Sequence, residues 1–397
     1  MFTILEEARE KYYIKFESDF DSKVSSAQIL GINLIESFST GTPFLLLKFI
    51  DGFGDLINHT YISPSAQYDL YIGKELKSAI KNSFSISALG SENITNGRPD
   101  YIAMDYTFVS SLWPKIFKNT YSRSWEEKKY SEVMEELATE IGFTNFDIEE
   151  TDKTFNVIQP DWTNLQMIKW LVKNSYSNLG IGGFDFGVKL DGSLIFKTLD
   201  SLFSQKPIKE LYLSNPTDDD DFFTTIDIKQ KYMDMINQGS GGYEYIYFDY
   251  NTKEFIKDTK KLSDSSQRQL SDWSYVATDH SEAQRRYFGG RDTATPMLAE
   301  NRILDVSNSI QSLDISISGD ITLHIGDIIN VIIPPSQNSK TIVNETYSGY
   351  WMIGKVNHDI SIDSGNFVSH LSLIRSGFDG KKLKDFEKTK TGKKITK

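Results

Sequence analysis

The fold of this chain is decided by three stretches near its C-terminal end, LDISISGDITLHIGDIINVIIPP (residues 313–335), GYWMIGKVNHDISI (349–362) and FVSHLSLIR (367–375). In the first stretch leucine and isoleucine recur with a period of two from Leu313 to Ile325, broken once at Gly319. Side chains with that period share one face of a β-strand. The first stretch therefore predicts strand structure with one apolar face.

Turn residues separate the predicted strands. Gly326-Asp327 predicts a turn, and Pro334-Pro335 ends the strand that follows it because proline donates no backbone hydrogen bond. Asp363 to Asn366 is a second cluster of turn-forming residues before the last strand. The sequence therefore predicts a meander that closes on itself or pairs at its edges.

Length and composition limit the class of protein. A chain of 397 residues is long for a single hydrophobic core, so we expect several domains. The absence of cysteine excludes disulfide bonds and thiolate metal sites. A net charge of -12 argues against a general nucleic-acid-binding surface. We expect no signal peptide, and no apolar run is long enough to predict a membrane span.

The N-terminal third is predicted to be mostly β, and a helical block follows it. Strands are expected at 44–50, 68–72, 79–88 and 101–112. Ser124 can cap a helix over 125–141, and Gly142 can end it. Asp161 or Thr163 can cap a second helix with the same apolar stripe.

The middle of the chain gives weaker signals. Asp191-Gly192 predicts a hairpin between strands at 184–190 and 193–199. The other expected features are a solvated four-aspartate loop at 218–221, a strand at 243–250, a polar segment at 257–274 and a helix at 296–307.

Enzyme signatures find little support. Gly349 to Lys355 has the spacing of a phosphate-binding loop, but Val356 replaces the required hydroxyl and the interior predicts a strand. No Gly-x-Ser-x-Gly elbow and no His-Glu-x-x-His motif occurs. No pair among the 55 acidic residues is singled out for glycoside cleavage. We therefore expect no catalysis, no cofactor and no metal.

His358 and His370 are a candidate constellation within the meander. A turn centred near Gly365 would place them opposite each other or one residue apart on neighbouring strands, where they could share a metal or a proton. The alternative, which we favour, is that each is a hydrogen-bonded histidine of the sheet. Three tryptophans, Trp162, Trp170 and Trp351, are expected to anchor a core or an interface.

Several segments carry a resemblance to a known family. The segments Gly326 to Pro334, Gly349 to His358 and Phe367 to Arg375 resemble the C-terminal barrel of baseplate hub proteins from contractile-tailed phages. The same hub fold is used by the T-even hub, late-control D proteins and the hub of type VI secretion spikes. Upstream, the segments 161–164, 184–198 and 100–112 are similar to parts of that hub.

The resemblance implies a mainly β fold with α+β insertions, comprising two tube-like β-barrel domains and two peripheral domains. The implied barrel domains are residues 1–115 and the combination of 208–226 with 308–378. The implied peripheral domains are 116–207, an α+β domain, and 227–307, an insertion, with 379–397 left as a basic tail.

The resemblance also implies a structural role in the virion. A homotrimeric ring of six similar barrels would adapt the six-fold tail tube to the three-fold central spike. Implied partners are the spike, tail-tube or tube-initiator proteins and other baseplate proteins. DNA would pass through the lumen during ejection without specific binding. The location would be the tail baseplate, assembled in the host cytoplasm.

Two alternatives to a phage baseplate hub stay open at this point. One is the hub of a secretion-system or bacteriocin contractile spike, which the same motifs would fit. The other is a cell-wall glycan hydrolase or glycan-binding β-protein.

The basic tail is the sharpest charge feature of the chain. From Lys381 to Lys397 it has eight lysines against two acidic residues, a balance of +6, which leaves -18 for the rest of the chain. The tail is either a disordered end or a segment that orders against a partner. The candidate docking residues are Lys381, Lys382, Leu383, Lys384, Phe386, Lys393 and Lys394.

Overall fold

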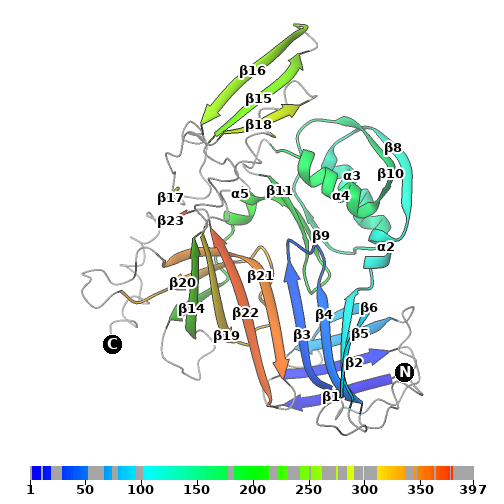
Figure 1. Cartoon of the computed structure of the whole chain (residues 1–397), viewed down its shortest axis with the longest axis vertical. Helices are drawn as coiled ribbons and strands as arrows, with labels where there is room; N and C mark the ends of the chain where they lie inside the picture. The colour runs from blue at the N-terminus through cyan, green and yellow to red at the C-terminus, as the bar shows by residue number, and fades with distance from the viewer. Residues whose placement is uncertain are drawn as a thin grey trace.

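The structure is mainly β, as the sequence predicts (Figure 1). The computed structural model describes residues 2–9, 12–18, 29–51, 67–73, 79–94, 102–177, 183–213, 222–230, 242–249, 252–261, 274–275, 284–289, 298, 311–335, 344, 347–361, 364–375 and 377–378. The predicted helix at 296–307, apart from Leu298, the four-aspartate loop and the basic tail lie outside these residues.

The first strand group comes from the N-terminal part of the chain. In hydrogen-bonded order its strands are β1 (Phe2–Arg9), β2 (Tyr12–Ser18), β5 (Tyr68–Gly73), β6 (Ile80–Ile94), β7 (Ile102–Ser110), β4 (Phe44–Asp51) and β3 (Ile29–Ser37). All of these pairs are antiparallel. The strands predicted at 44–50, 68–72, 79–88 and 101–112 are confirmed.

The strand ring is the second group, and each of its strands pairs with two others of the group. Its members are β13 (Lys209–Leu213), β14 (Phe222–Gln230), β19 (Gln311–Ser318), β20 (Ile328–Ile332), β21 (Gly349–Ser361) and β22 (Asn366–Arg375). The pairings run from β13 through β14, β19, β22, β21 and β20 back to β13. Large buried side chains fill the inside, among them Phe223, Leu313, Trp351 and Leu373.

A seam of backbone pairing joins the two groups into one sheet of 13 strands. Strand β3 pairs with β21 in antiparallel register, from Ser37 opposite Lys355 to Gly31 opposite Ser361. Figure 1 shows β3 and β21 side by side, with the N-terminal strands on one side and β22, β19 and β14 on the other.

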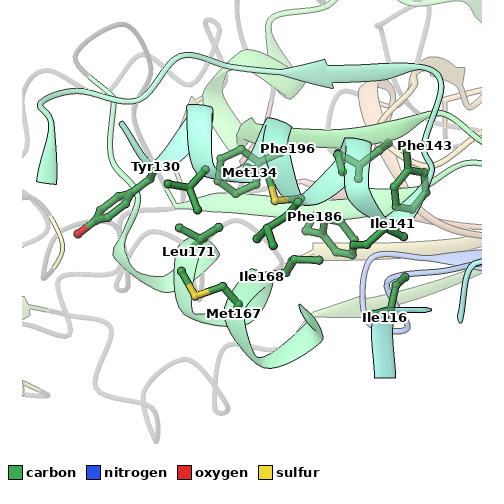
Figure 2. Close-up of a cluster of buried hydrophobic side chains, with 14 of the residues drawn as sticks. Ile116, Tyr130, Met134, Ile141, Phe143, Met167, Ile168, Leu171, Phe186 and Phe196 are labelled. Carbon is green, nitrogen blue, oxygen red and sulfur yellow. The ribbon is translucent and has the colours of Figure 1, made fainter. Parts of the chain in front are cut away.

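The helical block is inserted between the two strand groups in sequence. It contains α2 (Trp113–Phe117), β8 (Thr120–Lys128), α3 (Tyr130–Ile141), β9 (Phe146–Ile148), β10 (Phe155–Thr163), α4 (Asn164–Asn174), β11 (Phe184–Val188), β12 (Leu194–Thr198) and α5 (Leu199–Phe203). Its helices pack on the sheet β11-β12-β9. Figure 2 shows Met134, Ile168 and Phe196 meeting in the centre of this core.

A small sheet projects at the end of the molecule beyond the helical block (Figure 1). It consists of β16 (Glu254–Lys261), β15 (Gly242–Asp249) and β18 (Gln284–Gly289). A short pairing also joins β17 (Ser274–Tyr275) to β23 (Gly377–Phe378).

Local sequence signals predicted several details of the helical block correctly. Thr163 caps α4, because its hydroxyl accepts the Gln166 N–H while the Gln166 side chain accepts the Thr163 N–H. Gly142, with φ of 106°, ends α3. Gly192 lies in the hairpin between β11 and β12, with φ of 81°.

Two of the predicted boundaries are wrong. The helix predicted over 125–141 begins at Tyr130, because residues before it belong to β8 and pair with β10. The strand predicted from Leu313 to Ile325 ends at Ser318, since Asp320 accepts hydrogen bonds from the N–H and hydroxyl of Thr322 and makes a local turn. Of the polar segment expected at 257–274, Lys257 to Lys261 belong to β16 and pair with the aromatic strand β15, and residues 262–273 lie outside the described residues.

Gly319, at the end of β19, is in unusually close contact with an aromatic ring. A Cβ atom at this position would lie 2.0 Å from Cγ of Phe367. We expect Gly319→Ala to lower the free energy of unfolding by about 1–3 kcal/mol, the usual cost of overpacking, as measured by urea denaturation.

Gly354→Ala is the matched control, because its Cβ would meet the Ile374 side chain at an ordinary 3.5 Å. The double variant Gly319→Ala with Phe367→Ala should lose less stability than the two single changes predict together. Equal stability losses for Gly319→Ala and Gly354→Ala would contradict the close contact.

Candidate functional site

A buried carboxylate lies where the first strand group, the helical block and the strand ring meet. Glu36, near the end of β3, is completely buried. Its carboxylate accepts hydrogen bonds from the backbone N–H of Leu190 at 2.5 Å and of Ile325 at 3.1 Å. Nδ1 of His324 lies 2.8 Å from the same carboxylate. We call Glu36, Lys189, Leu190, His324, Ile325 and Asp327 the junction.

Leu190 is held from two sides. It lies at the tip of the β11–β12 hairpin, where its N–H donates to Glu36 of β3. Its carbonyl accepts a hydrogen bond from the side-chain amide of Asn82 in β6. Its side chain lines a small apolar hollow with Leu34, Leu70 and Ile321. The hairpin tip is therefore fixed to the inner face of the first strand group.

Asp327 organises the loop that carries His324. One of its carboxylate oxygens accepts the His324 N–H at 2.9 Å. Nζ of Lys189 lies 3.3 Å from the other oxygen, so this carboxylate also ties the loop to the hairpin. Asp191, on the same hairpin tip, accepts the N–H and the hydroxyl of Ser193 at 2.8 and 2.5 Å. These bonds fix the geometry of the tip.

The electrostatics of the junction favour a charged His324. Burial alone opposes the charge, but the hydrogen bond to Glu36 and the negative charges of Glu36, Asp191 and Asp327 outweigh burial and raise the pKa of His324. For Asp191, burial is outweighed by the Ser193 hydrogen bonds and the charges of His324 and Lys189, which lower the pKa of the carboxyl.

An apolar shell surrounds these polar contacts. Ile195, Leu202 and Phe203 of the helical block pack against Ile328 and Met352 of the strand ring. Gly187 lets the hairpin come so close that a Cβ there would lie 2.6 Å from Cδ1 of Ile325. The helical block is therefore packed tightly against the strand ring.

The two histidines singled out in the sequence do not form one site. Strand pairing places His370 opposite Asn357 and His358 opposite Ser369, so they are one residue apart and on opposite faces of the sheet. His358 is buried, with Nδ1 2.8 Å from the Ser369 hydroxyl, and His370 is exposed, with Nδ1 2.7 Å from the Ser316 hydroxyl. The interpretation as hydrogen-bonded sheet histidines is confirmed.

His358 is held neutral. Burial and the nearby charge of His324 lower the pKa of His358 to about 3. A neutral imidazole that hydrogen-bonds a hydroxyl is a packing group of the ring interior.

The other candidates from the sequence are the phosphate-loop spacing, the three tryptophans and the basic tail. Gly349 to Lys355 lies entirely within β21, so the phosphate-loop spacing has no loop. Trp351 is a core residue with the Arg375 guanidinium 3.9 Å from its ring centre, and Trp162 and Trp170 pack on the helical core. The lysines and apolar residues of the basic tail lie outside the described residues.

In the part of the chain that the structure describes, no group of three or more histidine or acidic side chains is arranged to hold a metal ion. No helix among these described residues has the length and apolar character needed to cross a membrane.

Sequence reasoning missed the junction. The signal for Glu36 was the inward period of β3, where Ile32 and Leu34 precede it on the same buried face. An acidic residue at the third position of such a face must find donors, because a bare buried carboxylate costs several kcal/mol. Nothing in the sequence identifies those donors, which lie 154 and 288 positions away.

The fold is similar to those of solved tail proteins. No family model and no curated protein matches the chain. A tail protein from Neisseria meningitidis MC58 aligns with a TM-score of 0.61 at 11% identity, over 92% of this chain and 97% of its own. The 43 kDa tail protein of prophage MuSo2 from Shewanella oneidensis aligns with a TM-score of 0.60 at 9% identity, over 92% and 98%.

A secretion-system component has a similar fold as well. The E. coli c3393 protein, a component of the type VI secretion system with structural similarity to the T4 bacteriophage tail proteins gp27 and gp5, aligns with a TM-score of 0.50 at 11% identity. The alignment covers 91% of this chain and 76% of that one. At such identities the likeness establishes a shared fold.

Buried His358 should make stability depend on pH. Below pH 6.5 the unfolded histidine binds a proton that the folded one, with a pKa of about 3, does not bind. Stability from this group is therefore present above pH 6.5 and lost as the pH falls toward 3, by about 1.4 kcal/mol per pH unit.

We expect His358→Asn, which keeps a hydrogen-bonding group for Ser369, to show a shallower loss of unfolding free energy between pH 6 and pH 4. His370→Asn is the control, because it removes an exposed histidine from the other face. Parallel pH curves for His358→Asn and the wild type would show that His358 does not titrate in this way.

Proposed function

We propose that this chain is a structural hub subunit of a contractile-tail baseplate. The observation that carries the proposal is fold similarity across 92% of the chain to two tail proteins, each of which is itself covered almost completely. The hub motifs of the sequence support it independently, because they fall on β20, β21 and β22 of the strand ring.

The strand pairings support two barrel-like hub domains. The cycle of pairings through the strand ring supports the second domain, assembled from 208–226 with 308–378. The first strand group supports the first domain, within 1–115. The helical block and the small sheet β16-β15-β18 would then be the peripheral parts, within 116–207 and 227–307.

As far as the structure describes it, the interior of the strand ring is packed with side chains and leaves no channel for DNA. Buried residues such as Trp351 and Phe223 fill the interior of the strand ring, as side chains do in small barrels. A DNA conduit therefore has to lie between subunits of an assembly. This agrees with a homotrimer whose six barrel-like domains surround a lumen.

In this proposal the work of the chain is geometric. Three copies with two similar domains each present near six-fold symmetry to the tail tube and three-fold symmetry to the central spike. The partners would be the spike, tube or tube-initiator proteins and other baseplate proteins, in the virion tail after assembly in the host cytoplasm. No enzymatic step is assigned to the chain.

A second candidate is the hub of a secretion-system spike. The observation that favours it is the fold similarity to the type VI secretion component. The tail proteins match with higher TM-scores and nearly equal lengths, so we place the phage baseplate first. No described feature favours a cell-wall hydrolase.

The hub proposal predicts a closed trimer. Light scattering of the purified chain should give three times the subunit mass of 45.3 kDa for the chain alone, and that mass plus the mass of the spike for the complex. Electron microscopy should show a ring with three-fold and near six-fold symmetry. A chain that stays monomeric with and without the spike would contradict the hub.

The basic tail remains a proposed docking segment. Deleting Lys381 to Lys397 should leave the trimer folded but weaken its affinity for the spike or a neighbouring baseplate protein. The loss of affinity should be largest at low salt, where charges are least screened. Binding titrations at two salt concentrations measure this. A variant with Leu383 and Phe386 changed to serine separates apolar contact from charge. Unchanged affinity for every partner after the deletion would mean a disordered end.

A further inference from the structure

The junction has one titratable donor among three. The N–H groups of Leu190 and Ile325 donate to Glu36 at any pH, whereas the charge of His324 depends on pH. The Glu36 side chain has no exposed surface and that of His324 is 11% exposed, so water can replace little of a lost interaction. The strength of this contact therefore depends on the protonation of His324.

Charged groups face His324 from every element packed around it. The charges that act on His324 are those of Glu36 on β3, Asp191 on the hairpin tip and Asp327 on its own loop. The neutral His358 on β21 feels the charges of His324 and Asp320, and the nearby lysines are Lys189 on the hairpin tip and Lys209 on β13. Lys189 lies 3.3 Å from Asp327 and Lys209 lies 2.8 Å from Asp320, so each lysine already has a carboxylate partner. His324 is the cation in direct contact with Glu36.

We propose that the Glu36–His324 pair is a pH-responsive latch that holds the tip of the β11–β12 hairpin and the loop of His324 against β3. With His324 protonated, the latch is closed. As the pH rises, His324 loses its proton, and Glu36 is left as a buried anion with neutral donors only. The hairpin tip and the loop of His324 then separate from β3.

The opening has a defined location. Leu190 connects Glu36 to the hairpin tip, and Ile325 connects it to the loop before β20. Loss of the pair exposes these two N–H groups together, although they lie in different parts of the chain. The β3–β21 seam is held by backbone hydrogen bonds along its whole register, from Ser37 opposite Lys355 to Gly31 opposite Ser361, and these bonds do not titrate, so the seam stays closed.

Hydrogen exchange measured by mass spectrometry on the full chain tests the latch. The informative peptides cover residues 186–193 and 320–327, and a peptide from β22, residues 369–374, is the internal reference. Between pH 6 and pH 9, after correction for intrinsic exchange rates, protection of the two informative peptides should fall together by about tenfold in the wild type. The reference should keep its protection.

Variants identify the group responsible. His324→Gln should give low protection of both peptides at every pH, with no pH dependence. Glu36→Gln keeps an acceptor but removes the anion, and it should abolish the pH dependence as well. His370→Gln, the matched control on the outer face, should behave as the wild type does.

Three results would overturn the latch. They are constant wild-type protection of the two peptides from pH 6 to pH 9, an equal loss in the reference peptide, and an unchanged pH dependence in His324→Gln. Should His324→Gln fail to fold, as judged by circular dichroism, the wild-type series and Glu36→Gln decide the question alone. The test needs neither a trimer nor a tail partner, so its outcome is separate from that of the hub proposal.

Discussion

The buried carboxylate of Glu36 constrains how the three parts of this chain are arranged. A charge removed from water costs several kcal/mol unless hydrogen bonds and a counter-charge surround it. Here the donors come from the tip of an inserted hairpin and from a loop of the strand ring, so the cost is met only when all three parts are in place. Apolar packing around Glu36 adds stability but is less directional than hydrogen bonding. The three hydrogen-bond donors to the carboxylate fix the position of the hairpin tip and the loop relative to β3.

Two kinds of joint therefore hold the architecture together. The seam between β3 and β21 aligns the strand groups along a line of backbone bonds. The junction pins the helical block at one point of that line. Gly187 adds a close contact, because a Cβ there would require the Ile325 side chain to shift. The orientation of the helical block is consequently set by directed polar contacts and by close packing at Gly187.

Local patterns predicted much of the fold, and non-local contacts explain the failures. Gly142 and Thr163 act through neighbours a few residues away, so their roles were visible in the sequence. Residues 125–128, with two glutamates and a lysine, favour a helix locally, but their pairing with β10 makes them a strand. The junction could not be predicted, because no short-range pattern relates Glu36 to Leu190 or His324. The alternation of β3 could only indicate that Glu36 needs buried donors.

The seam has a consequence for which sequences can adopt this fold. Every residue has a backbone carbonyl, and every residue except proline has a backbone N–H. A seam of backbone hydrogen bonds therefore places few demands on residue identity. Substitutions can accumulate along β3 and β21 while the two halves keep their alignment, provided that the inward period of two persists. Proteins with 9–11% identity that share this architecture are what such a joint permits. A frame of backbone hydrogen bonds can therefore stay the same while most side chains along it differ.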